Sequence, residues 1–574
     1  MGQCQTKTVA EPAEVKEREV VQVSAAPDLK EKPAAEPQMG VKPNIDGAFQ
    51  FIGGERLPWA GETVDVTSAI RDPSTGERTV IGRMAQFSEA EAVKAVEAAA
   101  KAWDKGQGAW PQLPLCERIA AIKKYVECLA PARTSIVNAL MWEICKSTTD
   151  AASEFDRTMK FIDAVITQLQ SGDSTEPLGD WTTVSGVRGR VRRGPVGVTM
   201  MLAPFNYPLN EMYAMMIPAL LMGNVIVLKL PSIGGLAHIL TAEALKAALP
   251  PGVVNFVTGA GRKTMGPIME TGLVDCLGFI GGAKATDALV KQHPQPHRLK
   301  VFSQLEGKNI AIVLPDADLE VATKQILLGS LSYNGQRCTA CKLIMAHKSV
   351  ADALTKKIVA GVNALKVGLP WEDAKITPLP EPAKPAYLQG LIDDAVSEGA
   401  AVMNAKEGGG KCVGSLFTPA VLYPVTPTMR LFHEEQFGPV VPIASYADIT
   451  EVHDAVRASW NGQQAAIFTK DPKATGPLVD MLSTVVGRIN LNAQCSRGPD
   501  SFPFSGRRSS AMGTMSVSEA IRAFSIEVLV AFPDNSDNRL LAESMEAETK
   551  FLQPIIKKMK VDDAAGVPDL AMGA

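Results

Sequence analysis

A cysteine in a polar, glycine-containing loop is the first feature that could carry chemistry. Residues 329–341 read GSLSYNGQRCTAC, between an apolar helical run and the strand-like segment 342–347. A nucleophilic cysteine needs open approach and support for its thiolate, and Arg337 beside Cys338 supplies positive charge. Gly335 lets backbone N–H groups approach a substrate. Because a small residue packed under a loop is the ordinary alternative, the case for Cys338 depends on the rest of the chain.

The same loop contains a C-x-x-C pair, Cys338 and Cys341. A thioredoxin-like motif is one interpretation, but the glycine-rich surroundings favour a packing role for Cys341. The six histidines are scattered and have no metal-ligand spacing with cysteines. We therefore predict no metal site.

Length and composition exclude several classes of protein. A chain of 574 residues is too long for one core, so two or more domains are expected. A net charge of −4 provides no field for nucleic acid. The nine cysteines are irregularly spaced and no secretory segment precedes them, which favours reduced thiols in an intracellular protein. The most apolar stretch, 212–230, is interrupted by Pro218 and Asn224, so we expect it in a core and not in a membrane.

Both ends of the chain differ in composition from the region between them. MGQCQT matches the myristoylation pattern at Gly2, with Cys4 placed for a second acyl chain. One myristoyl chain binds membrane at only about 10⁴ M⁻¹, so the second signal matters. Residues 1–48 are predicted to be a disordered tether, giving a cytoplasmic protein with peripheral membrane attachment as a hypothesis; a chance match and an inert extension are the alternatives. Residues 533–574 form a polar extension with a helix expected near 539–559.

Local signals place several helices and one basic strand. Ser88 with Glu91 forms a capping box that opens a helix through Trp103. Further helices are expected over 115–130 and 133–145, with a break at Pro131, and over 150–169. Arg157 falls off the apolar stripe of the last of these, and periodicity alone predicts a solvated side chain. The segment 187–193, VRGRVRR, is typical of an exposed or inter-subunit strand; its arginines are expected to be solvated, with binding to acidic lipid or RNA as the alternative.

Two regions alternate between strands and helices. From 195 to 305, apolar runs at 196–202, 224–230, 253–257 and 276–280 are separated by helical segments. Such alternation predicts βαβ units and a parallel sheet. Ligands then lie at the carboxyl ends of the strands, where Ala203–Pro208 and Lys229–Ser232 are found. A second alternating region, 300–487, contains Cys338.

Several segments together resemble the aldehyde dehydrogenase superfamily. They are APFNYPLN at 203–210, VIVLKLPS at 225–232, SYNGQRCTA at 332–340 and HEEQFGPVVP at 433–442. The run RINLNAQCSRGPDSFPFSGRRSS at 488–510 is similar to the non-phosphorylating, NADP-dependent glyceraldehyde-3-phosphate dehydrogenase branch. The resemblance covers about 50–532.

The resemblance implies an α/β fold with two parallel-sheet domains and a small β oligomerisation arm, assembled as a homodimer or homotetramer. The expected parts are a Rossmann-like NADP-binding domain (49–186 and 195–303), a catalytic domain (304–487) and the arm (187–194 and 488–532).

The resemblance also implies a covalent mechanism. Cys338 as thiolate attacks an aldehyde, and the amide of Asn206 with the Cys338 backbone N–H stabilises the oxyanion. Hydride then passes to a nicotinamide, and water hydrolyses the thioester. Without Cys338, Asn206 is better explained as a turn residue before Pro208.

Cofactor and substrate contacts follow by position. The resemblance places Lys229 at the adenine ribose and Glu435, with Phe437 of the same motif, at the nicotinamide ribose. Ser232 stands where NAD-preferring relatives often carry glutamate, so NADP is favoured, because a hydroxyl can donate to a 2′-phosphate that a carboxylate would repel. The residues implied for a sugar phosphate such as glyceraldehyde 3-phosphate are Arg157, Tyr207, Arg337 and Arg497.

One departure from the family pattern concerns the general base that takes a proton from water during thioester hydrolysis. Relatives carry Glu-Leu-Gly-Gly-Lys, whereas this chain has Gln304-Leu305-Glu306-Gly307-Lys308. An amide cannot take a proton from water. In an extended strand residues i and i+2 share a face, so Glu306 is predicted to serve instead. Two alternatives stay open: a dehydrogenase of another small aldehyde, with CoA-acylating enzymes included, and a membrane-tethered scaffold on an impaired enzyme fold.

Overall fold

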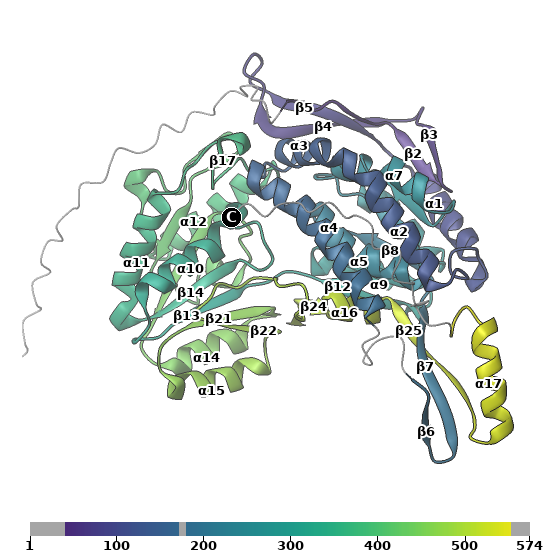
Figure 1. The fold of residues 1–574 in the computed structure, drawn as a ribbon. Coiled ribbons are helices and arrows are strands. Elements are labelled where there is room, and N and C mark those ends of the chain that lie inside the picture. The colour runs from purple at the N-terminus through teal and green to yellow at the C-terminus, as the bar shows by residue number, and fades with distance from the viewer. Residues whose placement is uncertain (1–40, 172–179, 553–574) are drawn as a thin grey trace, which may run out of the picture.

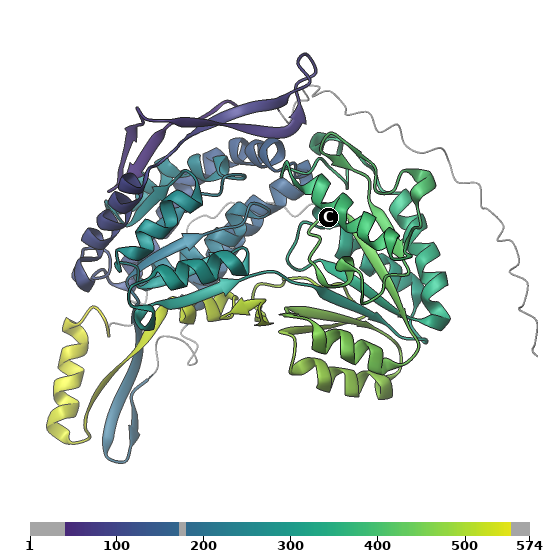
Figure 2. The same ribbon diagram turned by 180° about the vertical axis from the view of Figure 1, so that it is seen from behind.

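Two α/β lobes make up most of the protein, and a hairpin arm with a helix projects from the first of them (Figure 1). The computed structural model describes residues 41–171 and 180–552. A six-stranded sheet forms the centre of the first lobe and a seven-stranded sheet that of the second. Seen from behind, the N-terminal strands lie across the helices of the first lobe (Figure 2). In the described ranges no helix is long and apolar enough to cross a bilayer.

The predicted N-terminal helices are confirmed. Helix α1 (Glu89–Trp103) begins at the Ser88–Glu91 capping box. A short 3₁₀ turn at Ala130–Ala132, which contains Pro131, separates two helices because proline cannot continue the hydrogen-bond ladder. These helices and the one that follows are α2 (Leu115–Leu129), α3 (Arg133–Glu143) and α4 (Thr148–Gln170).

Before α1, the chain forms small antiparallel units that pack on the first lobe. Strand β1 pairs with β5 inside the segment expected as a tether up to residue 48, so that boundary is wrong by a few residues. The open edge of β5 accounts for the ordering of this short strand, because it offers unpaired backbone groups. The strands are β1 (Ile45–Gly47), β2 (Phe49–Ile52), β3 (Glu55–Pro58), β4 (Thr63–Arg71) and β5 (Arg78–Ala85). Residues 1–40, with Gly2 and Cys4, lie outside the described residues.

The sheet of the first lobe has the order β10-β9-β8-β11-β12-β24. All neighbours are parallel except β24, which runs antiparallel to β12. The chain starts in the middle at β8, moves out to β10, and then returns to the other side of β8. The strands are β8 (Val198–Leu202), β9 (Val225–Lys229), β10 (Val254–Val257), β11 (Cys276–Ile280), β12 (Lys300–Gln304) and β24 (Ala511–Met512). The order therefore reverses between β8 and β11, where a parallel sheet offers a ligand crevice.

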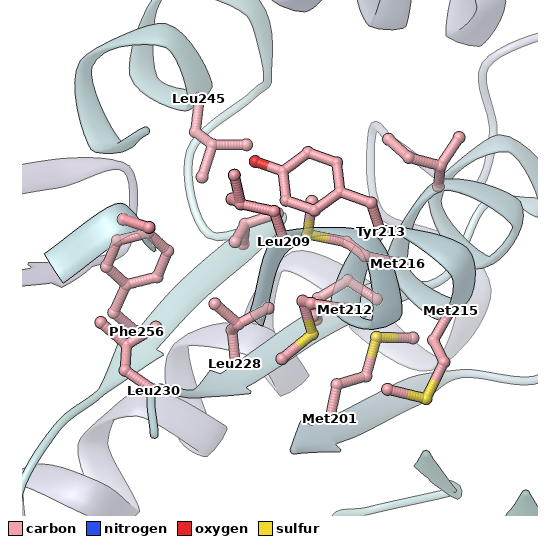
Figure 3. Close-up of a cluster of buried hydrophobic side chains, with 14 of the residues drawn as sticks. Met201, Leu209, Met212, Tyr213, Met215, Met216, Leu228, Leu230, Leu245 and Phe256 are labelled. Carbon is pink, nitrogen blue, oxygen red and sulfur yellow. The ribbon is translucent and has the colours of Figure 1, made fainter. Parts of the chain in front are cut away.

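Helix α5 (Pro208–Met222) is buried almost all round and packs against β8 and β9. Figure 3 shows its leucine, tyrosine and methionine side chains among residues from the neighbouring strands, including Met201 and Leu228. Flexible thioethers fill irregular gaps between helix and sheet. This packing fixes the N-terminus of α5 at the carboxyl end of β8.

The sheet of the second lobe has the order β15-β18-β19-β14-β13-β21-β22, parallel except at β15. Along β13, Ile310 and Ile312 join one buried cluster while Ala311 and Val313 join another, so both faces are covered. The strands are β13 (Asn309–Val313), β14 (Cys341–His347), β15 (Ala401–Val402), β18 (Ala420–Tyr423), β19 (Val440–Tyr446), β21 (Gln464–Phe468) and β22 (Arg488–Leu491).

The other helices connect these strands. In the first lobe they are α6 (Leu236–Ile239), α7 (Ala242–Ala248), α8 (Gly261–Glu270), α9 (Ala283–Gln292) and α16 (Val517–Ala523). In the second they are α10 (Leu319–Leu331), α11 (Lys348–Asn363), α12 (Lys384–Ser397), α13 (Arg430–His433), α14 (Ile449–Ala458) and α15 (Pro472–Ser483). Short strands are β16 (Cys412–Val413), β17 (Leu416–Phe417), β20 (Asn461–Gly462) and β23 (Arg507–Arg508).

The arm is smaller than expected. It consists of β6 (Thr182–Val184), β7 (Val187–Pro195) and β25 (Ser525–Pro533). Of the expected segment 488–532, only β25 pairs with β7; β22 completes the second sheet and β24 the first. The chain between them thus links the two lobes before it reaches the arm.

The arm's arginines are not a solvated face. Helix α17 (Ser536–Glu548) packs beside the arm, where Glu546 pairs with Arg190 at 2.7 Å. Arg192 is buried and donates to the carbonyl of Leu552. The C-terminal extension therefore neutralises and covers part of β7, the strand whose arginines were expected to be solvated.

Candidate active site

Both lobes contribute to one cavity of about 1000 Å³. Of the residues proposed from sequence, it is lined by Cys338, Asn206, Glu306, Glu435, Phe437, Arg157, Tyr207, Arg337 and Arg497. Two others, Lys229 and Ser232, lie outside this lining, at and just beyond the end of β9. The fold thus gathers nine side chains from distant parts of the sequence.

The Cys338 loop is held by unusual backbone geometry. Tyr333, Asn334 and Gly335 all have positive φ (49°, 56° and 69°) in a 3₁₀ turn after α10. The amide of Asn334 bonds to Thr377, which stabilises a conformation that non-glycine residues rarely adopt. Downstream, the carbonyl of Cys338 accepts from Asn309 Nδ2 at 2.8 Å. The nucleophile is therefore carried on a fixed turn.

The electrostatics of the thiol differ from the sequence expectation. Burial raises the pKa of Cys338, Glu211 and Glu435 raise it further, and Lys342 lowers it. Arg337 was expected to support the thiolate, but its Nη2 donates to the carbonyls of Leu328 and Gly329 at the end of α10. Lys342, whose Nζ donates to the Cys338 carbonyl at 2.6 Å, is the cation beside the nucleophile. Lys342 lies on β14, four residues after Cys338, and no sequence motif indicated this role.

Asn206 is tied directly to the Cys338 loop. It is buried between β8 and α5, and its Nδ2 donates to the carbonyl of Gln336 at 2.7 Å. The amide group carries a second N–H. The arrangement brings one amide donor into the cavity that holds the thiol, as the oxyanion role requires.

A buried ion pair that the sequence did not predict supports this region. Lys146 and Glu154 have fully buried side chains and form a salt bridge. The ammonium lies 3.3 Å from the centroid of the Tyr207 ring. The carboxylate accepts from the backbone N–H groups of Leu209 and Asn210, in the first turn of α5. The pair thereby fixes the segment that carries Asn206 and Tyr207.

Lys146→Met is expected to lower the free energy of unfolding by about 3–5 kcal/mol, because it leaves the Glu154 carboxylate buried without its cation. The double variant Lys146→Met/Glu154→Gln should recover most of this loss, since the amide oxygen still accepts at α5 without a charge. Thermal denaturation of the three proteins measures the effect. Equal melting temperatures for wild type and Lys146→Met would show that the pair contributes no stability.

Two arginines form the polar end of the cavity. Periodicity alone predicted a solvated Arg157, but the side chain is partly buried and makes two bonds to Asp500, at 2.7 and 3.1 Å. The Arg497 side chain is 7% exposed and pairs with both Glu211 and Asp500. Its Nη2 is buried and has no hydrogen-bond partner among the described residues. A buried guanidinium N–H in this position is suited to an anionic ligand.

Glu435 and Phe437 occupy the other side of the cavity. Glu435 accepts from Lys342 Nζ at 2.7 Å and from Gly307 N at 3.1 Å. Phe437 has a φ of 43° and meets Phe205 edge-on. The buried ammonium of Lys308 donates to Leu431, Glu434 and Gln436 and fastens this segment. No pattern in the sequence indicated this structural role of Lys308.

The residues present also fit a dinucleotide. Burial lowers the pKa of Lys229 to about 8, and its Nζ donates to the adjacent carbonyl of Leu230. Exposed Ser232 follows three residues later. Gly281 and Gly282 line the cavity after β11, next to the point at which the strand order reverses. Such a crevice at the carboxyl ends of parallel strands is where dinucleotides bind.

Gln304 and Glu306 both line the cavity. Gln304 is buried and donates from Nε2 to the carbonyl of Gly513 at 3.3 Å. Both carboxylate oxygens of Glu306 accept from Ala283 N at 3.1 Å. A Cβ on Gly307 would lie 3.0 Å from the Cys338 carbonyl oxygen, so the backbone next to Glu306 touches the nucleophile's loop. Strand β12 ends at Gln304, so Glu306 lies beyond the extended strand that the sequence predicted, but its carboxyl group still lines the cavity two residues from the position of the family's base.

Cys341 lies behind the cavity. It is buried, and a hydrogen bond with Cys495 lowers its pKa. It packs in the hydrophobic cluster on one face of the second sheet. In the part of the chain that the structure describes, no group of three His, Cys, Asp or Glu side chains could hold a metal ion.

Comparisons with known proteins agree with this geometry. Residues 59–528 match the model of the aldehyde dehydrogenase family, so the chain belongs to that family. The chain is 35% identical over 460 residues to the NADP-dependent glyceraldehyde-3-phosphate dehydrogenase of Streptococcus equinus, covering 79% of this chain and 92% of that protein. Its counterpart in Pisum sativum is 32% identical over 487 residues, covering 83% and 94%.

Solved structures give the same result. The NADP-dependent glyceraldehyde-3-phosphate dehydrogenase of Bacillus halodurans C-125, complexed with NADP, superposes with a TM-score of 0.76 at 32% identity, covering 85% of this chain and 99% of that chain. The lactaldehyde dehydrogenase of Escherichia coli gives a TM-score of 0.77 at 25% identity, covering 86% of this chain and 100% of that one. The predicted α/β fold with two sheets is confirmed.

Proposed function

We propose that the protein oxidises glyceraldehyde 3-phosphate to 3-phosphoglycerate with NADP and without inorganic phosphate. The names of its relatives support this activity. Within the chain, the observation that carries it is the buried Nη2 of Arg497, which lies in the same cavity as Cys338 and has no hydrogen-bond partner in residues 41–171 and 180–552. A phosphate held there would place the aldehyde carbon of a three-carbon substrate within the cavity that contains the thiol.

The chain's own residues account for each step apart from hydride acceptance, which bound NADP supplies. The Cys338 sulfur adds to the carbonyl carbon, and the developing oxyanion accepts from Asn206 Nδ2 and the Cys338 N–H. Loss of hydride leaves a thioester on Cys338. Glu306 then removes a proton from water, which attacks the thioester and releases the acid and the thiol. The overall change is aldehyde, water and NADP⁺ to acid, NADPH and H⁺.

Two residues at the end of β9 support a preference for NADP over NAD. Ser232 carries a hydroxyl that can donate to a 2′-phosphate, and Lys229 contributes a nearby cation. A carboxylate at 232 would repel that phosphate. Efficiency with NADP should therefore exceed that with NAD.

The test is NADPH formation, followed by absorbance, with glyceraldehyde 3-phosphate, unphosphorylated glyceraldehyde and a longer aliphatic aldehyde. Each is assayed with NADP or NAD and with or without CoA. We expect the phosphorylated aldehyde and NADP to give the highest kcat/KM without CoA or phosphate. Equal or higher efficiency with NAD, or with the uncharged aldehydes, would contradict the proposal.

A second candidate, a CoA-acylating dehydrogenase, is favoured by one observation. Gln304 stands at the position of the family's base, and such an enzyme transfers the acyl group to a thiol without a base for water. A strict requirement for CoA in the same assay would select it. A scaffold without catalytic activity would give no NADPH under any condition.

Assembly and attachment are also proposed. The apolar side chains of Val187, Val191 and Leu529 on the arm are exposed, which supports a homodimer or homotetramer formed through it. We also propose that the enzyme is cytoplasmic and that acylation at Gly2 and Cys4 tethers it to a membrane surface. Light scattering tests the first proposal. An unmodified N-terminus in the intact mass of native protein would overturn the second.

A further inference from the structure

The carboxylate of Glu306 already occupies the start of a helix. Both its oxygens accept from the N–H of Ala283, the first residue of the ten-residue helix α9. Gly282 is the preceding residue, and a Cβ there would lie only 3.0 Å from Glu306 Oε1. Helix N-termini present unpaired N–H groups and the positive end of the helix dipole, so they bind anions. In this structure the anion is a side chain of the protein itself.

The position of α9 makes this contact relevant to the cofactor. The helix follows β11, the strand beside β8 at which the sheet order reverses. In open α/β sheets, dinucleotides bind at that crevice, with the diphosphate at a helix N-terminus. Gly281 and Gly282, which lead into α9, line the cavity together with Glu306. The N–H group that holds Glu306 is therefore one that a diphosphate would use.

Only the side chain of Glu306 is free to leave this position. Its carbonyl accepts from Ser510 Oγ at 2.7 Å, and the next residue, Gly307, donates to Glu435. The backbone of Gly307 also packs against the carbonyl of Cys338. A fixed backbone with a side chain of three torsions lets the carboxylate leave α9 without a shift of the Cys338 loop.

We propose that Glu306 competes with the diphosphate of the dinucleotide for the N–H groups at the start of α9, so that it weakens cofactor binding and leaves α9 when the cofactor binds. The inference rests on the proposed function, because it assumes a dinucleotide in the cavity. Glu306 thereby sets cofactor affinity as well as serving hydrolysis.

Calorimetric titration of wild type and Glu306→Gln tests this competition without turnover. One ligand is 2′-phospho-ADP-ribose, which carries the diphosphate, and the other is 2′-AMP, which lacks it. Glutamine keeps the shape and can still accept from Ala283, so the fold is retained, but it removes the competing charge. We expect Glu306→Gln to bind 2′-phospho-ADP-ribose about 3- to 30-fold more tightly and 2′-AMP as wild type does.

Asp287→Asn is the matched control, because it removes one carboxylate from α9 at an exposed position that does not line the cavity. It should leave both affinities as in wild type. Unchanged binding of 2′-phospho-ADP-ribose by Glu306→Gln would mean that Glu306 is only a helix cap, and tighter binding of both ligands would mean a general charge effect; either result overturns the inference. Since wild-type NADPH formation is measured separately, an active enzyme with unchanged affinities would reject this inference and leave the proposed function intact.

Discussion

Arg497→Leu is expected to lower kcat/KM for glyceraldehyde 3-phosphate by about 10²-fold, mainly through KM, while that for unphosphorylated glyceraldehyde stays nearly unchanged. The guanidinium is buried at the cavity and its Nη2 has no partner among the described residues. A charge-assisted bond to a phosphate is worth about 1.5–3 kcal/mol. The leucine variant would also leave Glu211 and Asp500 without that cation, and both would repel a dianion.

Two further variants separate these contributions. Arg497→Lys keeps the charge but loses the planar fork, so its KM for the phosphorylated substrate should lie between those of wild type and Arg497→Leu. Arg457→Leu is the matched surface control, because its ion pair with Asp454 is largely exposed. Steady-state kinetics with both aldehydes measures all three proteins. Equal losses for the charged and uncharged aldehydes would show that Arg497 maintains the loop and does not recognise phosphate.

Elements with local signals could be predicted from the sequence. The Ser88–Glu91 capping box, the break at Pro131 and the strand run 276–280 all depend on neighbouring residues, and each lies where expected. The short strands β22 and β24 were placed in the arm instead of the two large sheets. They contain four and two residues, too few for a periodic pattern to show their partners.

Site residues were predictable only through motif resemblance, and their pairings were not predictable at all. Arg157 bonds to Asp500, 343 positions away, so no local pattern could show that its side chain turns inward. The cation beside Cys338 is Lys342, whereas the adjacent Arg337 donates to carbonyls of α10. Electrostatics of this kind depend on distances that the fold sets after the chain is packed.

The second large effect is a loss of turnover when Glu306, the proposed substitute for the family's base, is replaced. Glu306→Gln is expected to lower steady-state NADPH formation by about 10²- to 10⁴-fold, the range of general base catalysis. Acylation of Cys338 should persist, because hydride transfer needs the thiol, Asn206 and the cofactor but no base for water. Rapid mixing should therefore show a burst of one NADPH per active site, followed by almost no turnover.

The pH dependence of that burst identifies the group that limits acylation. Burial raises the pKa of Cys338, so the thiolate fraction, and with it the burst rate, should increase throughout the neutral range and keep increasing past the usual pKa of a thiol. The burst in Glu306→Gln should follow the same profile as in wild type. A burst that disappears in the variant would show that Glu306 takes the proton from the thiol itself.

Restoring the family arrangement is the complementary experiment. Gln304→Glu combined with Glu306→Gly places a carboxyl group at the family position and removes the one at α9. Because Gln304 already lines the cavity, turnover in this double variant should recover part of the loss seen in Glu306→Gln. Full wild-type turnover by Glu306→Gln would instead mean that another acceptor serves water, and turnover that returns only on addition of CoA would mean that the thioester is normally released to a thiol.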